Sequence, residues 1–373
     1  MKILFLVSSL NTGGAERVAT TLASAWSRRG DDVTLVSTFP QRGSCFYPLD
    51  AGVKLVWIAD RLNGARHPLR VTAAKLRALR AMMVDEAPDV VISFLTNVNV
   101  MALLAHWGLK VPIVVCERTN PAAARNSGAV LRAMRRLTYP RADVVTVQAE
   151  SSVEAFLRMV PGIRRLEVVS NPLPPELLER PLRPAASAGR KRLMAMGRLV
   201  PAKQFDVLIE AFSQLASGAP DWDLVIWGDG PMREALARQI AGVGMEARIS
   251  LPGRTESPWD ELSKADAFAL TSAVEGFPNV LLEAMALGLP CIAFDCPSGP
   301  AEMTRHGQDA LLIPLGDATG LREGLQRLMQ DPALRAELAG RAAESVRERY
   351  ALPRVLQRWD EIMKQAGADP ATG

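Results

Sequence analysis

Short apolar, β-branched segments alternate with longer amphipathic segments along almost the whole chain. The first apolar segment, KILFLVSS, is followed by a predicted helix near Glu16–Arg29 and then by DVTLVST. The same alternation continues through DVVISFL, PIVVCE, ADVVTVQ and LEVVS, and later through RLMAMG, DLVIWG, ARISLPG, AFALT, CIAF and LLIP. Near-continuous apolar strands between helices are typical of parallel sheets that are covered on both faces. The pattern therefore predicts an α/β protein with doubly wound sheets.

One proline-rich segment, near residues 170–192, interrupts this alternation. A chain of 373 residues exceeds the usual size of a single core, so two domains are expected. We predict a first Rossmann-like domain over residues 1–170, a linker over 171–190 and a second domain over 191–349. A helix at about 350–366 is expected to pack back on the first domain. Ligands of doubly wound sheets bind outside the carboxyl ends of the strands, so we expect the site in a cleft that both domains face.

Cysteine and histidine are too few and too scattered to suggest a metal site. The four cysteines show no CxxC pair, which suits a reducing compartment, and the three histidines are isolated. No segment approaches the ~20 apolar residues needed to span a bilayer. The segment MKILFLVSSL lacks a clear cleavage site and is interpreted as a first buried strand. We predict a cytoplasmic protein without a metal or other cofactor.

Charge is distributed unevenly. Residues 1–170 contain 22 Lys and Arg against 13 Asp and Glu, a net of +9, whereas the remainder has 22 against 27, a net of −5. A basic first half indicates an anionic partner, such as phospholipid, lipid-linked phosphate or nucleic acid. On charge alone, a solvated surface without a partner is equally compatible.

Two loops after predicted strands carry glycines or cations. In NTGGAER, Gly13 and Gly14 let the backbone approach a ligand, and the following helix offers free N–H groups to an anion. This loop lacks the GxGxxG pattern, which argues against a dehydrogenase. In GRLVPAKQ, Arg198 and Lys203 lie five residues apart across a turn and could converge on a diphosphate.

A third loop, EGFPNVLLE, places two carboxylates around a turn and a predicted helix from Pro278 to Ala286. Glu275 precedes the helix, and Glu283 lies roughly 7–8 Å further along at 1.5 Å per residue. This separation predicts different depths for the two side chains rather than an acid–base couple around one bond. A nucleotide diphosphate sugar fits, with the sugar near Glu275, the diphosphate at Gly276–Asn279 and the ribose near Glu283.

In this order, the motifs resemble those of the retaining glycosyltransferases of family 4, two-domain enzymes of the GT-B type. The resemblance covers nearly the whole chain through GGAER, GRLVPAK, WGDGPMRE, EGFPNVLLE and GLPCIAFD. Within that family, SFLT, CERTNP and DCPSGPAE are similar to bacterial enzymes that extend lipid-linked glycans for surface polysaccharides or glycoproteins.

The resemblance implies a role for each matching residue. Glu275, Arg198 and Lys203 would be catalytic, with the two cations holding the donor diphosphate and Glu275 meeting the donor sugar. Arg118 occupies the position where many relatives carry a histidine that contacts the sugar. The implied donor-binding residues are Gly13, Gly14, Arg254, Gly276, Phe277, Pro278, Asn279 and Glu283, and the candidate sugar or acceptor residues are Glu117, Arg118, Asn120 and Asn97.

The resemblance thus implies a metal-independent hexosyl- or N-acetylhexosaminyltransferase that uses a UDP-sugar and retains anomeric configuration. The acceptor would be a glycan or a lipid-linked oligosaccharide bound by the basic first domain, with no nucleic-acid partner. Basic and apolar residues of Ala129–Tyr139 could contact the inner face of an anionic membrane, or the same helix could simply pack on the core. A nucleotide-sugar epimerase or hydrolase, and a non-catalytic sugar-nucleotide binder, are the alternatives.

Overall fold

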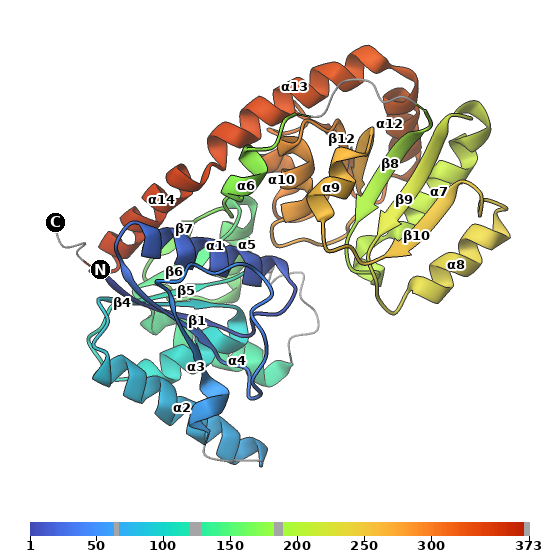
Figure 1. Ribbon diagram of the computed structural model, residues 1–373. Coiled ribbons are helices and arrows are strands. Elements are labelled where there is room, and N and C mark those ends of the chain that lie inside the picture. Colours follow the sequence, from blue (N-terminus) through green and yellow to red (C-terminus); the bar gives the residue numbers. More distant parts are fainter. Residues whose placement is uncertain (63–66, 119–127, 183–188, 369–373) are drawn as a thin grey trace. The chain divides into compact units, whose positions relative to one another are not determined.

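The computed structural model describes residues 1–62, 67–118, 128–182 and 189–368 (Figure 1). The chain forms two compact units, Met1–Pro172 with Pro353–Gly373, and Leu173–Leu352. Each unit is built on one sheet whose paired strands are parallel. The predicted fold class, α/β with two doubly wound Rossmann-like sheets, is confirmed.

The first unit has a seven-stranded sheet in the order β3-β2-β1-β4-β5-β6-β7. Its central strands are apolar at nearly every position, so helices bury both faces. The strands are β1 (Lys2–Val7), β2 (Asp32–Ser37), β3 (Lys54–Trp57), β4 (Val90–Phe94), β5 (Ile113–Cys116), β6 (Val144–Val147) and β7 (Leu166–Val168). The helices are α1 (Gly14–Arg28), α2 (Pro68–Asp85), α3 (Thr96–His106), α4 (Ala129–Thr138), α5 (Val153–Met159) and α14 (Leu352–Gln365), with 3-10 turns at Ile58–Arg61, Tyr139–Arg141 and Glu150–Ser152.

Helix α14 shares the core of the first unit, although it is the last helix of the chain. Trp359 is fully buried and packs edge-on against Trp26 of α1, with ring centroids 5.7 Å apart. Arg358 forms an ion pair with Glu167 at 2.5 Å. These contacts explain why residues beyond 352 belong to the unit that begins the chain.

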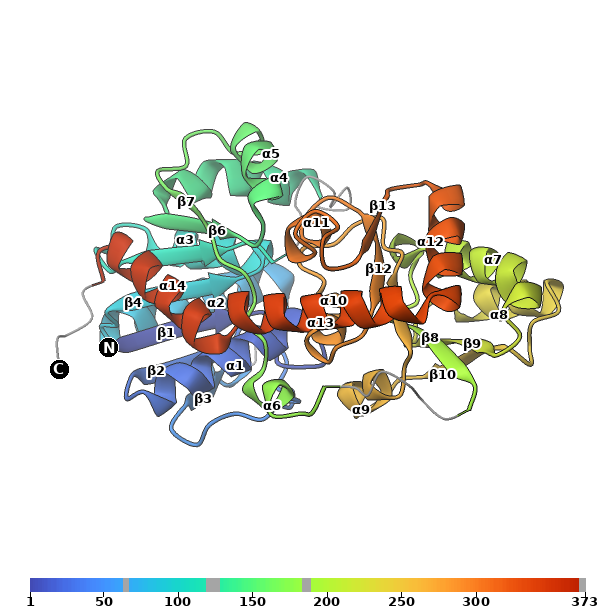
Figure 2. The same cartoon turned by 90° about the horizontal axis from the view of Figure 1, so that it is seen from above.

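The second unit has a six-stranded sheet in the order β10-β9-β8-β11-β12-β13. Helices α7, α8 and α12 pack on one face, and α9, α10, α11 and α13 on the other (Figure 2). The strands are β8 (Lys191–Met196), β9 (Trp222–Trp227), β10 (Ile249–Gly253), β11 (Ala267–Leu270), β12 (Cys291–Asp295) and β13 (Leu311–Pro314). The helices are α6 (Pro175–Leu178), α7 (Phe205–Leu215), α8 (Arg233–Gly242), α9 (Pro258–Ser263), α10 (Asn279–Ala286), α11 (Pro300–Met303), α12 (Ala318–Gln330) and α13 (Pro332–Arg349), with 3-10 turns at Pro201–Lys203 and Ala216–Gly218.

The segment expected as a linker, 171–190, is partly packed. Leu173 and Leu177 are fully buried in the core beside α10, and the Leu173 N–H donates to the Tyr350 carbonyl at 2.8 Å. The prolines keep this segment out of a long helix, while its leucines supply apolar surface to bury. Residues 183–188 lie outside the described part.

No helix among the described residues combines the length and the hydrophobicity that a membrane span requires.

Candidate functional site

In the second unit, the loops that follow β8, β9 and β11 are hydrogen-bonded to one another at one edge of the sheet. The Leu199 N–H donates to the Asp229 carbonyl at 3.0 Å, and the Ala273 N–H donates to the Ala202 carbonyl at 2.8 Å. Because all these strands are parallel, their carboxyl ends meet at this edge. The motifs GRLVPAK, WGDGPMRE and EGFPNVLLE are thereby assembled into one place.

Two glycines after β9 allow this close approach. A Cβ atom on Gly228 would lie 1.8 Å from the Gly197 carbonyl oxygen, and one on Gly230 would lie 2.4 Å from that of Leu199. Gly228 also has a φ of +141°, which side-chain-bearing residues rarely adopt. The sequence signal for this close approach is the spacing WGDG directly after a strand.

Lys203 and Glu275 form an ion pair at this edge, with 2.5 Å between Lys203 Nζ and Glu275 Oε1. The Ser272 hydroxyl also donates to Glu275 Oε1, at 2.6 Å. The sequence analysis assigned Lys203 to the donor diphosphate and Glu275 to the donor sugar. In the structure the two side chains are in direct contact. Ser272 was not predicted, because a serine before a loop carries no motif of its own.

A buried thiol lies close to this ion pair. Burial, and secondarily the Glu275 carboxylate, raise the pKa of Cys296 to about 12, while the Lys203 charge acts in the opposite direction. Cys296 therefore stays a neutral thiol at physiological pH and adds no charge to the site.

Glu283 is buried inside α10, with 3% of its surface exposed, and accepts a hydrogen bond from Trp259 Nε1 at 2.9 Å. Trp259, from α9, is a residue that sequence reasoning missed. The helix begins at Asn279, one residue after the predicted start, and no side chain caps it. Two N–H groups at this end are engaged within the chain, since Asn279 donates to the Phe277 carbonyl and Leu281 to the Pro278 carbonyl, both at 2.9 Å. The end of α10 therefore favours an anion mainly through the helix dipole.

The turn before α10 is supported from two sides. The Phe277 ring packs edge-on against Tyr350, with centroids 5.7 Å apart. A Cβ on Gly299 would lie 2.7 Å from Pro278 Cδ, so the loop of DCPSGPAE lies directly against Pro278. These contacts fix Gly276–Asn279 relative to Glu275.

The other predicted cations of this unit are exposed. Arg198 follows β8 and has no ion-pair partner within the described ranges. Arg254 follows β10 and lies 3.8 Å from Asp229. Both arginines are therefore on loops at the carboxyl edge, as the sequence analysis expected.

In the first unit, Gly13 and Gly14 lie at the start of α1, after β1. The Gly13 N–H donates to the Tyr47 hydroxyl at 3.3 Å, and Glu16 accepts from Ser9 Oγ at 3.0 Å. The loop is thus held in place by side chains that the sequence analysis did not single out.

Glu117, a candidate acceptor residue, lies inside the first unit with 1% of its surface exposed. Its two oxygens accept hydrogen bonds from Thr96 Oγ1 at 2.7 Å and from the Tyr139 hydroxyl at 2.5 Å, and Arg135 lies 3.9 Å away. Burial raises the pKa of the Glu117 carboxyl group. Both oxygens are therefore engaged in the core rather than presented to a ligand.

Arg118 is also buried. Its guanidinium lies over the Phe94 ring, 3.5 Å from the centroid, and donates to Asn171 Oδ1 at 2.7 Å. Its Nε and Nη2 atoms find no hydrogen-bond partner among the described residues, and burial lowers its pKa to about 10. Asn97 is exposed in the first turn of α3, and Asn120 lies outside the described residues.

Across the described ranges, no group of three or more His, Cys, Asp or Glu side chains is arranged to hold a metal ion.

Two family models match separate parts of the chain. The model for glycosyl transferases group 1 matches residues 183–345, and the model for the glycosyl transferase 4-like domain matches residues 13–172. Together the two models cover most of the chain, which therefore belongs to the group 1 glycosyltransferases with a glycosyl transferase 4-like first domain. The predicted family is therefore confirmed, and the edge formed by GRLVPAK and EGFPNVLLE is part of a glycosyltransferase.

Curated relatives cover the chain almost end to end. An exopolysaccharide phosphotransferase of Streptomyces coelicolor is 30% identical over 98% of this chain, which spans only 41% of that relative. A GalNAc-α-(1→4)-GalNAc-α-(1→3)-diNAcBac-PP-undecaprenol α-1,4-N-acetyl-D-galactosaminyltransferase of Campylobacter jejuni is 27% identical over 98% of this chain and 99% of its own. The amylovoran biosynthesis glycosyltransferase AmsD of Erwinia amylovora is 27% identical over 97% of this chain and 99% of its own length.

Solved structures share the fold. HepE of Anabaena, in complex with UDP and glucose, has a TM-score of 0.79 at 20% identity and covers 98% of this chain and 99% of its own. Sucrose-phosphate synthase of Thermosynechococcus elongatus has a TM-score of 0.83 at 17% identity, with coverages of 99% and 100%. At such identities the likeness supports the GT-B fold alone.

Proposed function

We propose that this glycosyltransferase moves a hexosyl or N-acetylhexosaminyl group from a UDP-sugar to a glycan or lipid-linked oligosaccharide, with retention, in bacterial surface-glycan biosynthesis. The observation that carries the proposal is the Lys203–Glu275 pair at the same edge as the uncapped start of α10, with Glu283 further along that helix. The surface-glycan setting draws on the Campylobacter and Erwinia relatives, and UDP draws on the ligand named for HepE.

The donor diphosphate would lie at Gly276–Asn279, against the positive N-terminal end of the α10 dipole. Negative charge develops on this diphosphate as the bond to the sugar breaks. Arg198, which is exposed and unpaired within the described ranges, and Lys203 would stabilise that charge. In this proposal the two cations and the helix N-terminus perform the charge stabilisation, and no step requires a metal.

Glu275 would contact the donor sugar while holding Lys203 in position. Since the spacing of the motifs identifies no nucleophile, we favour a front-face reaction in which the departing phosphate takes the acceptor proton. A trapped glycosyl adduct on Glu275 would instead identify this residue as a nucleophile.

The nucleotide is tested by calorimetry. We expect UDP to bind more tightly than GDP, and Glu283→Gln to weaken UDP binding about tenfold, or about 1.4 kcal/mol, by removing a charged acceptor for the ribose hydroxyls. Glutamine keeps the volume and an acceptor for Trp259, whereas alanine would leave a cavity in α10. Glu234→Gln, on the exposed surface of α8, is the matched control. Preference for GDP would change the donor class, and binding of neither nucleotide would remove the proposal.

We also propose that the basic first unit approaches an anionic membrane through α4 and its surroundings. Val130 and Leu137 of α4 are 77% and 62% exposed, and the exposed Trp107 ring lies 4.1 Å from the Arg141 guanidinium. Apolar side chains interspersed with arginines favour the interface of an anionic bilayer. Arg135, which the sequence placed in this basic surface, is instead buried beside Glu117, because it lies on the inward side of α4.

Vesicle flotation tests this contact. At low salt, vesicles that contain phosphatidylglycerol should retain the protein, and the double substitution Val130→Glu and Leu137→Glu should reduce retention several-fold. Leu315→Glu, at an exposed leucine of the second unit, should have no effect. Retention should fall as salt screens the charges. If the vesicles retain the double variant of α4 as well as they retain Leu315→Glu, α4 is not the membrane contact.

A further inference from the structure

The sheet of the second unit has one face that is only partly covered, beside β8, β9 and β10. On the opposite face, α7, α8 and α12 bury a continuous apolar core. The connection from β10 to β11 has to cross back over β9 and β8, and it contains only α9, a helix of six residues. Since a parallel sheet normally has helices on both faces, this short crossover leaves a hollow of about 310 Å³.

The strand sequences agree with a solvated face. The hollow side of β8, β9 and β10 carries the polar Arg192, Asp223 and Ser250 together with the apolar Met194 and Val225. The neighbouring positions Leu193 and Leu224 are buried on the other side. Such alternation is typical of strands that are buried on one face only. By contrast, the central strands β11 and β12 read AFAL and CIAF and are apolar on both faces.

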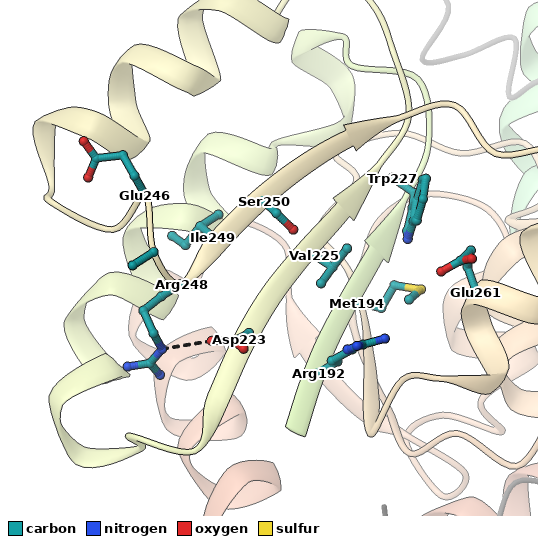
Figure 3. A pocket seen from close by; sticks show the side chains of 11 residues that line it. Arg192, Met194, Asp223, Val225, Trp227, Glu246, Arg248, Ile249, Ser250 and Glu261 are labelled. Carbon is teal, nitrogen blue, oxygen red and sulfur yellow. Dashed lines mark hydrogen bonds and ion pairs between the residues drawn. The ribbon is translucent and has the colours of Figure 1, made fainter. Parts of the chain in front are cut away.

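Several polar groups in the hollow have no described partner. The indole N–H of Trp227 is buried yet finds no acceptor in the part of the chain that the structure describes. Arg192 and Glu246 form no ion pair there either. In contrast, Arg248 is bound to Asp223, with 3.1 Å between Arg248 Nε and Asp223 Oδ1 (Figure 3). An orphaned indole N–H normally acquires a partner, so these groups point to a polar ligand.

The lining chemistry favours an uncharged ligand. The charges around the hollow largely cancel, because Asp223 is paired with Arg190 and Arg248 and Glu261 is paired with Lys264. The remaining Arg192 and Glu246 have opposite signs, so no excess charge selects a phosphate or a uronate. Figure 3 shows the Trp227 ring on the side of the hollow near Met194 and Glu261. An aromatic ring among carboxylate and guanidinium groups is suited to a pyranose, whose C–H face packs on the ring while its hydroxyls form hydrogen bonds.

We propose that this hollow is a glycan-binding subsite for neutral hexose or N-acetylhexosamine residues. Its volume lies at the lower end of the range for small-molecule sites, about 300–1,000 Å³, and so suits a short stretch of glycan. The inference rests on the proposed function in that a glycan is taken as the acceptor or product. It deepens that function by giving the donor-binding unit its own affinity for the glycan chain.

Saturation-transfer NMR and calorimetry on the whole protein test the subsite with maltotetraose, tetra-N-acetylchitotetraose and, as an anionic probe, tetragalacturonate. At least one neutral probe should bind saturably with a Kd on the order of 1 mM. Arg192→Ala and Trp227→Phe should each weaken this binding about fivefold or more. Arg238→Ala, on the outer surface of α8, should leave the binding unchanged. Arg192 is exposed, so its substitution is not expected to affect folding.

UDP binding to Arg192→Ala separates this inference from the proposed function. This variant should bind UDP as the wild type does, because Arg192 lies near the amino end of β8, away from the edge formed by Lys203, Glu275 and Glu283. If the wild type binds an oligosaccharide but does not bind UDP, the proposed donor is wrong and the subsite stands. The subsite is wrong if no neutral probe binds, if tetragalacturonate binds more tightly, or if Arg192→Ala binds as the wild type does.

Discussion

Replacing Lys203 with methionine should lower kcat about 10²- to 10³-fold, the usual cost of removing one preorganised group that stabilises transition-state charge. The substitution removes the charge that we assign to the departing diphosphate and keeps most of the aliphatic stem, which lies against Gly197. It also leaves the Glu275 carboxylate without its ion-pair partner, so the KM for the donor should rise. Steady-state kinetics with a radiolabelled UDP-sugar would measure both changes.

Lys191→Met is a closely matched control. Lys191 and Lys203 lie before and after the apolar part of β8, each is ion-paired to an aspartate or glutamate, and their side chains are 31% and 20% exposed. Only Lys203 is at the carboxyl edge. Because partly exposed ion pairs contribute little to stability, about 0–1 kcal/mol, both variants should melt close to the wild type. Equal kcat values for the two variants would show that Lys203 has no part in the chemistry.

The sequence predicted the location of the candidate site better than its contacts. Each motif was expected in a loop after a strand, and the parallel topology places those loops at one edge. The ion pair between Lys203 and Glu275 joins residues that are 72 positions apart, so no local pattern could indicate it. The hydrogen bond from Trp259 to Glu283 likewise depends on how α9 packs beside α10.

Burial of charged residues was the harder property to predict. Glu117 and Arg118 follow β5 in the segment CERTNP, which reads as a polar loop. In the structure both side chains turn into the unit, where Tyr139 and Asn171 provide partners from later parts of the chain. The sequence left open whether the basic and apolar residues of Ala129–Tyr139 face a membrane or pack on the core, and Arg135 proves to be buried. It lies four residues after Leu131, which packs on the core, so the helical period directs it inward.

We expect Glu117 to be a structural group, and Glu117→Ala should lower the free energy of unfolding of the first unit by about 3–5 kcal/mol. The alanine would leave Arg135, which is 2% exposed, without its carboxylate partner, and the Tyr139 hydroxyl without its acceptor. Glu117→Gln should cost less than Glu117→Ala, since it leaves no cavity, although it also removes the negative charge beside Arg135. Burial raises the pKa of this carboxyl group, so the site tolerates an uncharged group better than a surface position would, and the amide keeps an oxygen for Tyr139.

Urea unfolding, followed by circular dichroism and by activity, distinguishes this role from acceptor binding. Glu154→Ala removes an exposed carboxylate that is paired with Arg158 in the same unit, and it should change stability by less than about 0.5 kcal/mol. If Glu117→Ala unfolds at the wild-type urea concentration but raises the KM for the acceptor, Glu117 binds the acceptor and the buried network has been misassigned. If the transition of the first unit moves to lower urea while folded Glu117→Gln keeps the wild-type KM, the carboxylate is a structural group. The acceptor would then be recognised by other residues of the basic unit.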